Sequence, residues 1–442
     1  MPPDPADPVA ALLALEKLGI KFGLENIRAL TEALGRPQDA WPSVIVAGTN
    51  GKGSVAAMVE AALRASGRRA GLYTSPHLVR LEERFLVDGR PVPPERLRDS
   101  AGRVLRAIES ARASGALLAE PTFFEATTAV AFDLFREAAV DVAVLEVGLG
   151  GRFDATNVAS PIAGAITTID FDHQELLGHT LAAIAAEKAG IVKPGMRVVV
   201  GERKREAFEV IARACAERGA ALVAAGEGVS AEVSPEVLPG APPEPAIRLS
   251  LRTPIRDYGT LRLALRGRHQ AGNAVVAVRL LEAIDEAGLR VAPAAIAAGI
   301  RDTRWPGRLD LRRLGGGRAV LLDAAHNPAG AAVLASYLEE FAPDGLPIVF
   351  AVMRDKDVPG TLAPILGHAR PLIATRAPTP RAMAPREIAA VARRLGREEG
   401  VEVEEDPGAA LEAAWRSGAA VAACGSIFLV GEVFGRLGLS PW

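Results

Sequence analysis

The strongest chemical signal in the sequence is VAGTNGKGS at residues 46–54. It lies between a short apolar run and an apolar-periodic stretch at residues 55–65, so it is predicted to connect a strand to a helix. Backbone N–H groups of such a loop and the helix N-terminus can surround phosphate oxygens, and Lys52 adds a mobile cation. Gly53 separates Lys52 from Ser54, which departs from the general GxxxxGK[ST] pattern. The segment predicts a nucleoside triphosphate site, with a tight structural turn as the alternative.

Two further polar residues follow predicted strands. Glu146 ends an apolar run before the segment GLGGRFDATN, and His173 follows the run AITTID. A buried carboxylate needs a partner or a cation, and ligands of open α/β sheets bind at the carboxyl ends of the strands. Glu146 is therefore a candidate Mg²⁺ ligand, with an ion pair to Arg152 as the alternative. A lone histidine is more often structural, so only its place beside Glu146 favours His173 as a ligand.

Three other segments are weaker when taken alone. Lys188 in EKAGIVKPG suits a surface helix end, and Asn273 in GRHQAGNA suits a helix cap. Asp323 and His326 in LLDAAHNPAG lie on a predicted loop between a strand and a helix, where binding residues are common. Lysine is scarce, because only seven of the 51 basic residues are lysines. Each lysine is therefore a candidate for specific chemistry.

Composition excludes several function classes. The 442 residues predict two or three domains, and 49% hydrophobic with 24% charged residues suits an ordinary α/β protein. A net charge of −2 gives no positive field for nucleic acid. The longest uncharged stretches have 15 residues, too few to span a membrane, and the N-terminus carries acids where an export signal carries bases. Cys215 and Cys424 form no metal set, and so few thiols favour a reducing, cytoplasmic location. Charge and hydropathy together predict neither nucleic-acid nor membrane partners.

These residues need elements that bring them together. Apolar runs at residues 140–147, 162–169, 198–200 and 221–224 alternate with helical stretches, which predicts an α/β fold with a P-loop-type, mainly parallel sheet. Residues 226–258 are predicted to be a strand excursion or a loop region. A second βα series begins at Ala319 and predicts a smaller Rossmann-like α/β domain. We expect domains at residues 1–308 and 309–442.

Eleven ordered segments together resemble the folylpolyglutamate synthase/dihydrofolate synthase family, a branch of the Mur-ligase-like enzymes. They are GTNGKGS, YTSPHL, FFEATTAVAF, LEVGLGGRFDATN, ITTIDFDHQELLG, EKAGIVKPG, GRHQAGNA, WPGRLD, DAAHNPAG, MRDKD and GSIFLVGEV. The resemblance implies a ligase in which ATP phosphorylates the carboxylate of dihydropteroate or a reduced folate, and L-glutamate then displaces phosphate from the acyl phosphate. Phosphorylation supplies a leaving group that a free carboxylate lacks, and cations must offset the charge of the moving phosphoryl group.

The resemblance also implies residue roles. ATP would be bound by Asn50, Gly51, Lys52, Gly53, Ser54, Asn273, Arg308 and Asp323. Mg²⁺, in two sites, would be held by Ser75, Glu146, His173 and a CO₂-derived carbamate on Lys188, and the catalytic residues would be Lys52, Lys188 and His173. The 1–308 domain would bind the pterin through Phe123, Phe124, Arg152, Phe153, Asp154 and Ala155. The 309–442 domain would bind glutamate through His326 and Ser426.

Several alternatives remain open from the sequence. A GTPase-like switch would need a guanine-reading NKxD motif, which is absent, and a non-catalytic nucleotide-binding scaffold would have no use for the polar residues at successive strand ends. Within the ligases, a cell-wall-type Mur amino-acid ligase is the alternative. Dihydrofolate synthesis, folate extension, or both are consistent with the motifs. A monomer is the family expectation.

Overall fold

The computed structural model describes residues 7–442 except residue 20 and residues 239–243. The chain forms two compact units. The first contains Met1–Ser230, Arg252–Tyr258 and Asn273–Thr303, and the second contains Ala231–Leu251, Gly259–Gly272 and Arg304–Trp442. Part of the acidic N-terminal segment and part of the predicted 226–258 excursion lie outside the described residues. Among the described helices, none combines the length and the apolar character that crossing a bilayer requires.

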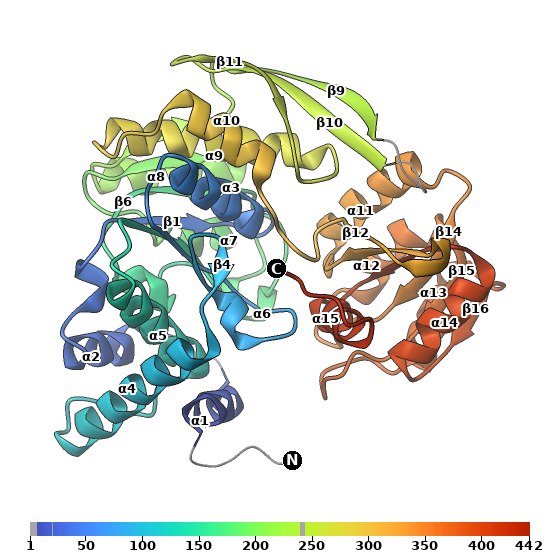
Figure 1. The fold of residues 1–442 in the computed structure, drawn as a ribbon, viewed down its shortest axis with the longest axis horizontal. Coiled ribbons are helices and arrows are strands. Elements are labelled where there is room, and N and C mark those ends of the chain that lie inside the picture. The colour runs from blue at the N-terminus through green and yellow to red at the C-terminus, as the bar shows by residue number, and fades with distance from the viewer. Residues whose placement is uncertain (1–6, 20, 239–243) are drawn as a thin grey trace. The chain divides into compact units, whose positions relative to one another are not determined.

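An eight-stranded sheet forms the centre of the first unit, in the order β4-β3-β2-β5-β1-β6-β7-β8 (Figure 1). Its strands are β1 (Ser43–Ala47), β2 (Ala70–Tyr73), β3 (Phe85–Val87), β4 (Arg90–Pro91), β5 (Val142–Glu146), β6 (Pro161–Ile166), β7 (Arg197–Val200) and β8 (Ala221–Ala224). The neighbouring strands in the part β2-β5-β1-β6-β7-β8 all pair in parallel. At one edge of the sheet, β3 pairs antiparallel with both β2 and β4. The predicted mainly parallel sheet is confirmed. The sequence analysis missed β2, β3 and β4, which are too short for a clear periodic pattern.

Helices accompany these strands through the first unit. They are α1 (Pro8–Ala14), α2 (Glu25–Ala33), α3 (Lys52–Ala65), α4 (Pro94–Ala113), α5 (Phe123–Glu137), α6 (Gln174–Leu177), α7 (Leu181–Ala189), α8 (Arg205–Glu217), α9 (His269–Glu286) and α10 (Pro293–Asp302), with 3-10 turns η1 (Leu15–Leu18), η2 (Pro37–Asp39), η3 (Leu81–Arg84) and η4 (Ala155–Val158). Helix α3 packs against α10 as well as against the sheet. A side chain at Gly299 of α10 would lie 2.5 Å from the Ala62 Cα, so the two helices need a glycine where they cross. This packing explains why most residues of α3 are buried.

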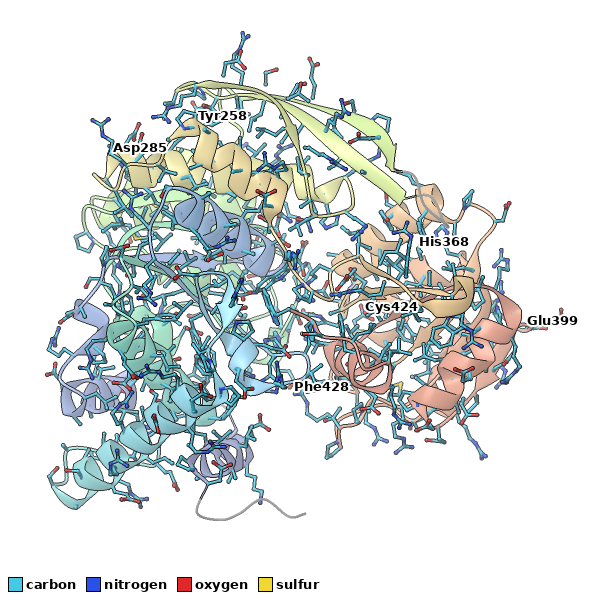
Figure 2. All side chains as sticks on the ribbon, in the orientation of Figure 1. Tyr258, Asp285, His368, Glu399, Cys424 and Phe428 are labelled. Carbon is cyan, nitrogen blue, oxygen red and sulfur yellow. The ribbon has the colours of Figure 1, made fainter. Side chains whose placement is uncertain are left out.

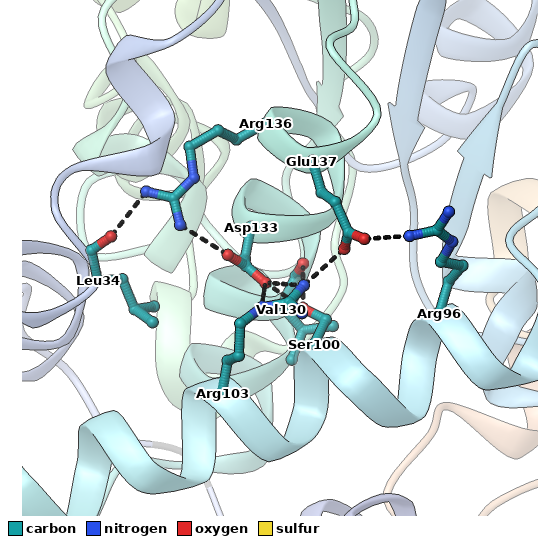
Figure 3. A network of polar contacts seen from close by, with 8 residues as sticks. All are labelled: Leu34, Arg96, Ser100, Arg103, Val130, Asp133, Arg136 and Glu137. Carbon is teal, nitrogen blue, oxygen red and sulfur yellow. Dashed lines mark hydrogen bonds and ion pairs between the residues drawn. The ribbon is translucent and has the colours of Figure 1, made fainter.

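A polar network joins α4 to α5 (Figure 3). The Asp133 carboxylate on α5 is 2% exposed and accepts hydrogen bonds from Ser100 Oγ at 2.7 Å and Arg103 Nε at 2.9 Å. Arg136 donates to the same carboxylate at 2.8 Å and to the Leu34 carbonyl at 2.7 Å. Arg103 also contacts Glu137 at 2.6 Å. Every charge in this network therefore has an opposite charge beside it.

The predicted excursion contains a three-stranded sheet in the order β11-β10-β9, formed by β9 (Ser230–Leu238), β10 (Glu244–Arg252) and β11 (Asp257–Arg262). Residues 252–258 belong to the first unit and are tied to α9 there. Tyr258 Oη donates to Glu282 at 3.0 Å, and Arg256 donates to Asp285 at 2.6 Å; Figure 2 labels Tyr258 and Asp285. The excursion is thus structured over its described residues.

The second unit is built on a six-stranded sheet in the order β12-β13-β17-β14-β15-β16. Its elements are β12 (Asp310–Arg313), η5 (Gly315–Gly317), β13 (Ala319–Asp323), α11 (Pro328–Phe341), β14 (Leu346–Phe350), α12 (Val358–Leu366), β15 (Ala369–Ala374), α13 (Pro385–Arg394), β16 (Val401–Val403), α14 (Pro407–Ser417), β17 (Ala420–Cys424) and α15 (Ile427–Arg436). Strand β12 pairs antiparallel with β13, whereas the pairs β13–β17, β17–β14, β14–β15 and β15–β16 are parallel. The predicted smaller Rossmann-like α/β domain is confirmed.

Candidate active site

The predicted phosphate loop connects β1 to α3. Gly48 has φ +145° and Gly51 has φ +86°, conformations that favour glycine. A side chain at Gly48 would lie 1.8 Å from Thr167 Oγ1, so the loop also needs glycine for close packing. Thr167 Oγ1 donates to the Asn50 carbonyl at 2.7 Å, and the Thr49 N–H donates to the Thr168 carbonyl at 2.7 Å. The loop is therefore held against the end of β6, with Gly53 and Ser54 in the first turn of α3.

Two lysines converge on this loop. Lys52 Nζ donates to the carbonyls of Gly48 at 3.0 Å and Thr49 at 3.1 Å, and Lys188 Nζ donates to the Gly48 carbonyl at 2.9 Å. Lys188 is only 4% exposed, near the end of α7. Burial, reinforced by the positive charge of Lys52, lowers the pKa of Lys188 to about 7. The surface-lysine interpretation of Lys188 is therefore wrong.

Glu146 lies at the carboxyl end of β5, where it pairs in register with Val46 of β1. Its side chain is buried and accepts a hydrogen bond from the Thr74 hydroxyl. Arg152 contacts a different carboxylate, that of Glu187, at 3.7 Å. The sequence analysis missed Thr74, although it directly precedes Ser75 in the YTSPHL segment. Glu146 therefore lies beside the strand that leads into the phosphate loop, and the Thr74 hydroxyl is one of its partners.

Ser75 and His173 follow the neighbouring strands β2 and β6. Ser75 is half-buried in the loop after β2. His173 begins the turn into α6 with φ +49°, and its side chain is 37% exposed, 3.8 Å from Asp172. Its loop is anchored to the phosphate loop because the Asp170 N–H donates to Thr49 Oγ1 at 3.1 Å. The ends of β2, β5 and β6 thus carry the predicted metal ligands along one edge of the sheet.

These groups do not form a preassembled metal site. The described residues contain no group of three or more histidine, cysteine, aspartate or glutamate side chains that could hold a metal ion. Mg²⁺, however, is commonly bound by one or two carboxylates, with water and substrate phosphates completing its shell. One buried carboxylate beside hydroxyl groups and a phosphate loop fits that pattern. The donor set therefore suits a metal ion that arrives with a nucleotide.

Aromatic side chains flank the same edge. Phe124 lies 5.9 Å from Tyr73 between ring centroids, and a side chain at Gly148 would lie 2.5 Å from its ring. Phe123 is largely buried and carries the Arg84 guanidinium 5.0 Å above its ring. The loop after β5 can thus approach the Phe124 ring closely, because Gly148 has no side chain.

The loop itself is organised by Asp154. This buried carboxylate accepts the N–H groups of Gly148 at 2.9 Å, Leu149 at 2.9 Å and Thr156 at 3.0 Å. Ala155 is buried at the start of η4. Phe153 is 41% exposed and packs edge-on against Phe22 at 6.2 Å, with the Arg152 guanidinium 5.8 Å from its ring. Of the predicted pterin residues, Arg152 and Phe153 are exposed and Phe124 is half-buried, while Asp154 fixes the backbone of the loop.

Asn273 lies within α9, which begins four residues earlier, so its interpretation as a helix cap is wrong. It lies against the phosphate loop instead, because a side chain at Gly51 would approach its Oδ1 to 2.5 Å. No local sequence pattern could predict this contact, because Gly51 and Asn273 are far apart along the chain. The predicted nucleotide residues of the first unit are therefore close together.

The second unit gathers its own predicted residues. Asp323 ends β13 and pairs in register with Cys424 of β17, which Figure 2 labels. The buried Asp323 carboxylate accepts the N–H groups of Leu309 at 2.7 Å and Ala325 at 2.8 Å, and burial raises its pKa although the Arg308 charge opposes that rise. His326 Nδ1 lies 2.9 Å from the Ala324 carbonyl. Parallel strand ends thus bring Asp323 and the loop of His326 to the edge where Ser426 follows β17.

Ser426 has a clear structural role. It is the N-cap of α15, and its Oγ accepts the Phe428 N–H at 3.1 Å. It is only 2% exposed. Because Ser426 Oγ already accepts this hydrogen bond, a contact with glutamate would use its second lone pair, its hydroxyl proton or its backbone.

Comparison with known proteins identifies the family. The Mur ligase middle domain matches residues 108–281, and the Mur ligase glutamate ligase domain matches residues 307–427. The dihydrofolate synthase/folylpolyglutamate synthase of Mycobacterium tuberculosis is 38% identical over 85% of this chain and 80% of its own length. The chain belongs to the folylpolyglutamate synthase/dihydrofolate synthase family. This membership favours the folate branch over the cell-wall-type Mur ligases.

Other relatives support the same family. A probable bifunctional folylpolyglutamate synthase/dihydropteroate synthase of Haloferax volcanii is 37% identical over 87% of this chain, which spans 44% of that protein's length. The M. tuberculosis folylpolyglutamate synthase, solved with ADP and AMPPCP, has a TM-score of 0.88, 33% identity and coverage of 99% of this chain and 100% of its own. A bifunctional folylpolyglutamate synthase/dihydrofolate synthase solved with Mn, AMPPNP and L-glutamate has a TM-score of 0.82, 29% identity and coverage of 99% and 100%. The two-unit α/β fold is therefore that of the family.

Proposed function

We propose that the chain adds L-glutamate to the carboxylate of dihydropteroate, of a reduced folate, or of both, through an acyl phosphate, and releases ADP and phosphate. Membership of the family makes the chain an ATP-dependent ligase. The observation that carries the proposal is the convergence of Lys52 and Lys188 on the Gly48 carbonyl, at the sheet edge that also bears Glu146.

ATP binding is assigned to two sets of residues. In the first unit, the N–H groups at the start of α3, together with Asn50, Gly51, Lys52, Gly53, Ser54 and Asn273, would surround the phosphates and position the nucleotide. Arg308 and Asp323, in the second unit, are also assigned to ATP, as the family resemblance implies. The positive N-terminus of α3 and the Lys52 ammonium would offset phosphate charge as the phosphoryl group moves.

Mg²⁺ is the metal that this donor set fits, and Ser75, Glu146, His173 and Lys188 would hold it. When bound, it would withdraw charge from the phosphates and from the attacking carboxylate. The amine of Lys188 must be neutral to react with CO₂, and its pKa of about 7 provides the neutral amine near neutral pH. The resulting carbamate would be an anion beside Lys52. This chemistry supports a carbamate on Lys188 in place of a buried cation.

The acceptor and glutamate would occupy different domains, residues 1–308 and residues 309–442. Phe123, Phe124 and the loop 152–155 would contact the pterin, and His326 and Ser426 would contact L-glutamate. Free, buried Cys215 and Cys424 suit a reducing compartment, so a cytoplasmic location is part of the proposal. The proposal also includes a monomer, as the family resemblance implies, without nucleic-acid or membrane partners, as charge and hydropathy predict.

A direct assay tests this function. Purified protein is given ATP, Mg²⁺ and L-glutamate with dihydropteroate or tetrahydrofolate in separate reactions. We expect a glutamylated product from at least one acceptor, with ADP and phosphate detected by phosphorus NMR. AMP and pyrophosphate would contradict the acyl-phosphate route, and no product from either acceptor would contradict the function.

A further inference from the structure

Arg84, at the end of η3, is a buried cation that neither the sequence analysis nor the proposed function uses. The residue is 6% exposed. Its Nε donates to His77 Nδ1 at 2.9 Å, and its guanidinium lies 5.0 Å above the Phe123 ring. Burial lowers the pKa of Arg84, which shows how poorly this environment suits a positive charge. An arginine nevertheless remains charged at physiological pH.

Among the described residues, no carboxylate forms an ion pair with Arg84. Its side chain contacts an imidazole, an aromatic ring and the Tyr73 side chain, and Glu16 and Glu146 attract it only from a longer distance. An imidazole is never an anion, so His77 orients the guanidinium without neutralising it. Arg279 provides a comparison, because it is 8% exposed and contacts Glu282 at 2.6 Å. A buried guanidinium without such a partner is costly unless a ligand supplies the anion.

The position of Arg84 indicates which anion this is. It lies on the ring of Phe123 and beside Tyr73, whose ring contacts Phe124. Tyr73 is followed by Thr74, which binds the Glu146 carboxylate. Arg84 therefore lies where the aromatic surface approaches the predicted metal ligand. The nucleotide phosphates have another cation, Lys52, at the Gly48 loop.

We infer that the Arg84 guanidinium binds the carboxylate of the acceptor, the group that becomes phosphorylated, and that His77 positions it. The inference rests on the proposed function. Arg84 would reduce the repulsion between this carboxylate and the γ-phosphate. A carboxylate oxygen then bonds to the γ-phosphorus as the bond from that phosphorus to the bridging oxygen of ADP breaks. The guanidinium remains beside the acyl oxygen until glutamate's amine displaces phosphate.

The test compares dihydropteroate with its carboxamide analogue, which keeps the pterin and the ring but carries no charge. Binding of each is measured by titration in the absence of ATP for the wild type, Arg84→Met and Arg84→Lys. We expect the wild type to prefer the carboxylate about 10- to 100-fold, the range for a hydrogen bond to a charged group. Arg84→Met should bind both compounds equally, and Arg84→Lys should retain part of the preference. Arg90→Met, which removes an exposed arginine on β4, should behave as the wild type.

Several outcomes would overturn the inference. One is an undiminished carboxylate preference in Arg84→Met. Another is a rise in the KM for ATP with an unchanged KM for the acceptor, because the guanidinium would then serve the nucleotide. If Arg84→Met does not fold by circular dichroism, Arg84→Lys decides: a reduced carboxylate preference supports the inference, and a preference equal to that of the wild type overturns it. A wild type that binds neither compound would contradict the proposed function instead.

Discussion

Two clusters of buried charge in the first unit are built differently. Between α4 and α5, Asp133 contacts both Arg103 and Arg136, so each charge meets its opposite. At the carboxyl edge of the sheet, Lys188 meets a backbone carbonyl and Arg84 meets an imidazole. A paired buried charge can be maintained by the protein alone, whereas an unmatched one lowers stability until a ligand or a modification supplies the opposite charge. The comparison separates charged groups that stabilise the fold from charged groups that we propose to be neutralised by a ligand or a modification.

The largest expected effect is on activity at the unmatched cluster. Lys188→Met removes the buried amine and any carbamate on it, and we expect kcat to fall at least about 100-fold, as for loss of an important group at a metal site. Phosphate release with saturating substrates measures the change. Lys17→Met, which removes an exposed lysine, is the control and should retain full activity. Near wild-type activity of Lys188→Met would remove this residue from the mechanism.

The same variant should reveal the cost of the unmatched charge. The pKa of Lys188 is about 7 in the folded protein and 10.5 ordinarily, so the unfolded state binds more protons between these pH values. Wild-type stability should therefore rise with pH across that window. Lys188→Met lacks this dependence, so its Tm advantage should be largest at pH 7 and shrink toward pH 10. Thermal unfolding in CO₂-free buffer without nucleotide measures it, and a constant difference in Tm would show that Lys188 does not bear this cost.

The paired cluster should respond in the opposite manner. Asp133→Ala leaves two arginines, each more than a third exposed, without their shared carboxylate. We expect a loss of about 2–3 kcal/mol in the free energy of unfolding, below the full cost of a fully buried pair because the arginines can reach water. Urea denaturation measures this loss, and kcat of the folded variant should stay within about twofold of the wild type, since Asp133 contacts no proposed substrate residue.

A control within the same network sharpens this result. Glu137 is 31% exposed and lies at the rim of the network. Glu137→Gln should cost less than about 1 kcal/mol, the usual range for exposed ion pairs. Equal losses for Asp133→Ala and Glu137→Gln would show that burial of the carboxylate does not control the effect.

The smallest expected effect comes from a paired cation beside the proposed metal ligands. Lys204 Nζ donates to the Ile169 carbonyl at 2.6 Å and contacts the Asp170 carboxylate, which holds the loop that ends in His173. Lys204→Met should raise the Mg²⁺ concentration for half-maximal rate about 3- to 10-fold without changing the KM for glutamate, because it acts only through loop position. Arg205→Met is the matched control, since Arg205 is the next residue and its side chain is 91% exposed. A change in both constants would indicate general loss of structure.

The sequence predicted those parts of the site that lie within one local pattern. The phosphate loop could be read from glycines and a lysine between an apolar run and a helix, and Glu146 from its place at the end of an apolar run. Thr74 and Arg84 were missed, because their contacts with Glu146 and Phe123 come from distant segments of the chain. The interpretations of Asn273 as a cap and of Lys188 as a surface residue were wrong for the same reason. A local sequence pattern does not predict which distant residues a side chain contacts in the folded protein.

The order of residues by itself determined the α/β class, the strand–loop–helix geometry at Gly48 to Lys52 and the family. These follow from periodicity, glycine conformation and motif order, all of which are local or sequential. Only the tertiary structure decided that Lys52 and Lys188 share the Gly48 carbonyl and that Asn273 lies against Gly51. It also decided that the buried Arg84 guanidinium meets an imidazole. Burial and charge pairing depend on long-range packing, and burial shifts the pKa values on which the proposed chemistry depends.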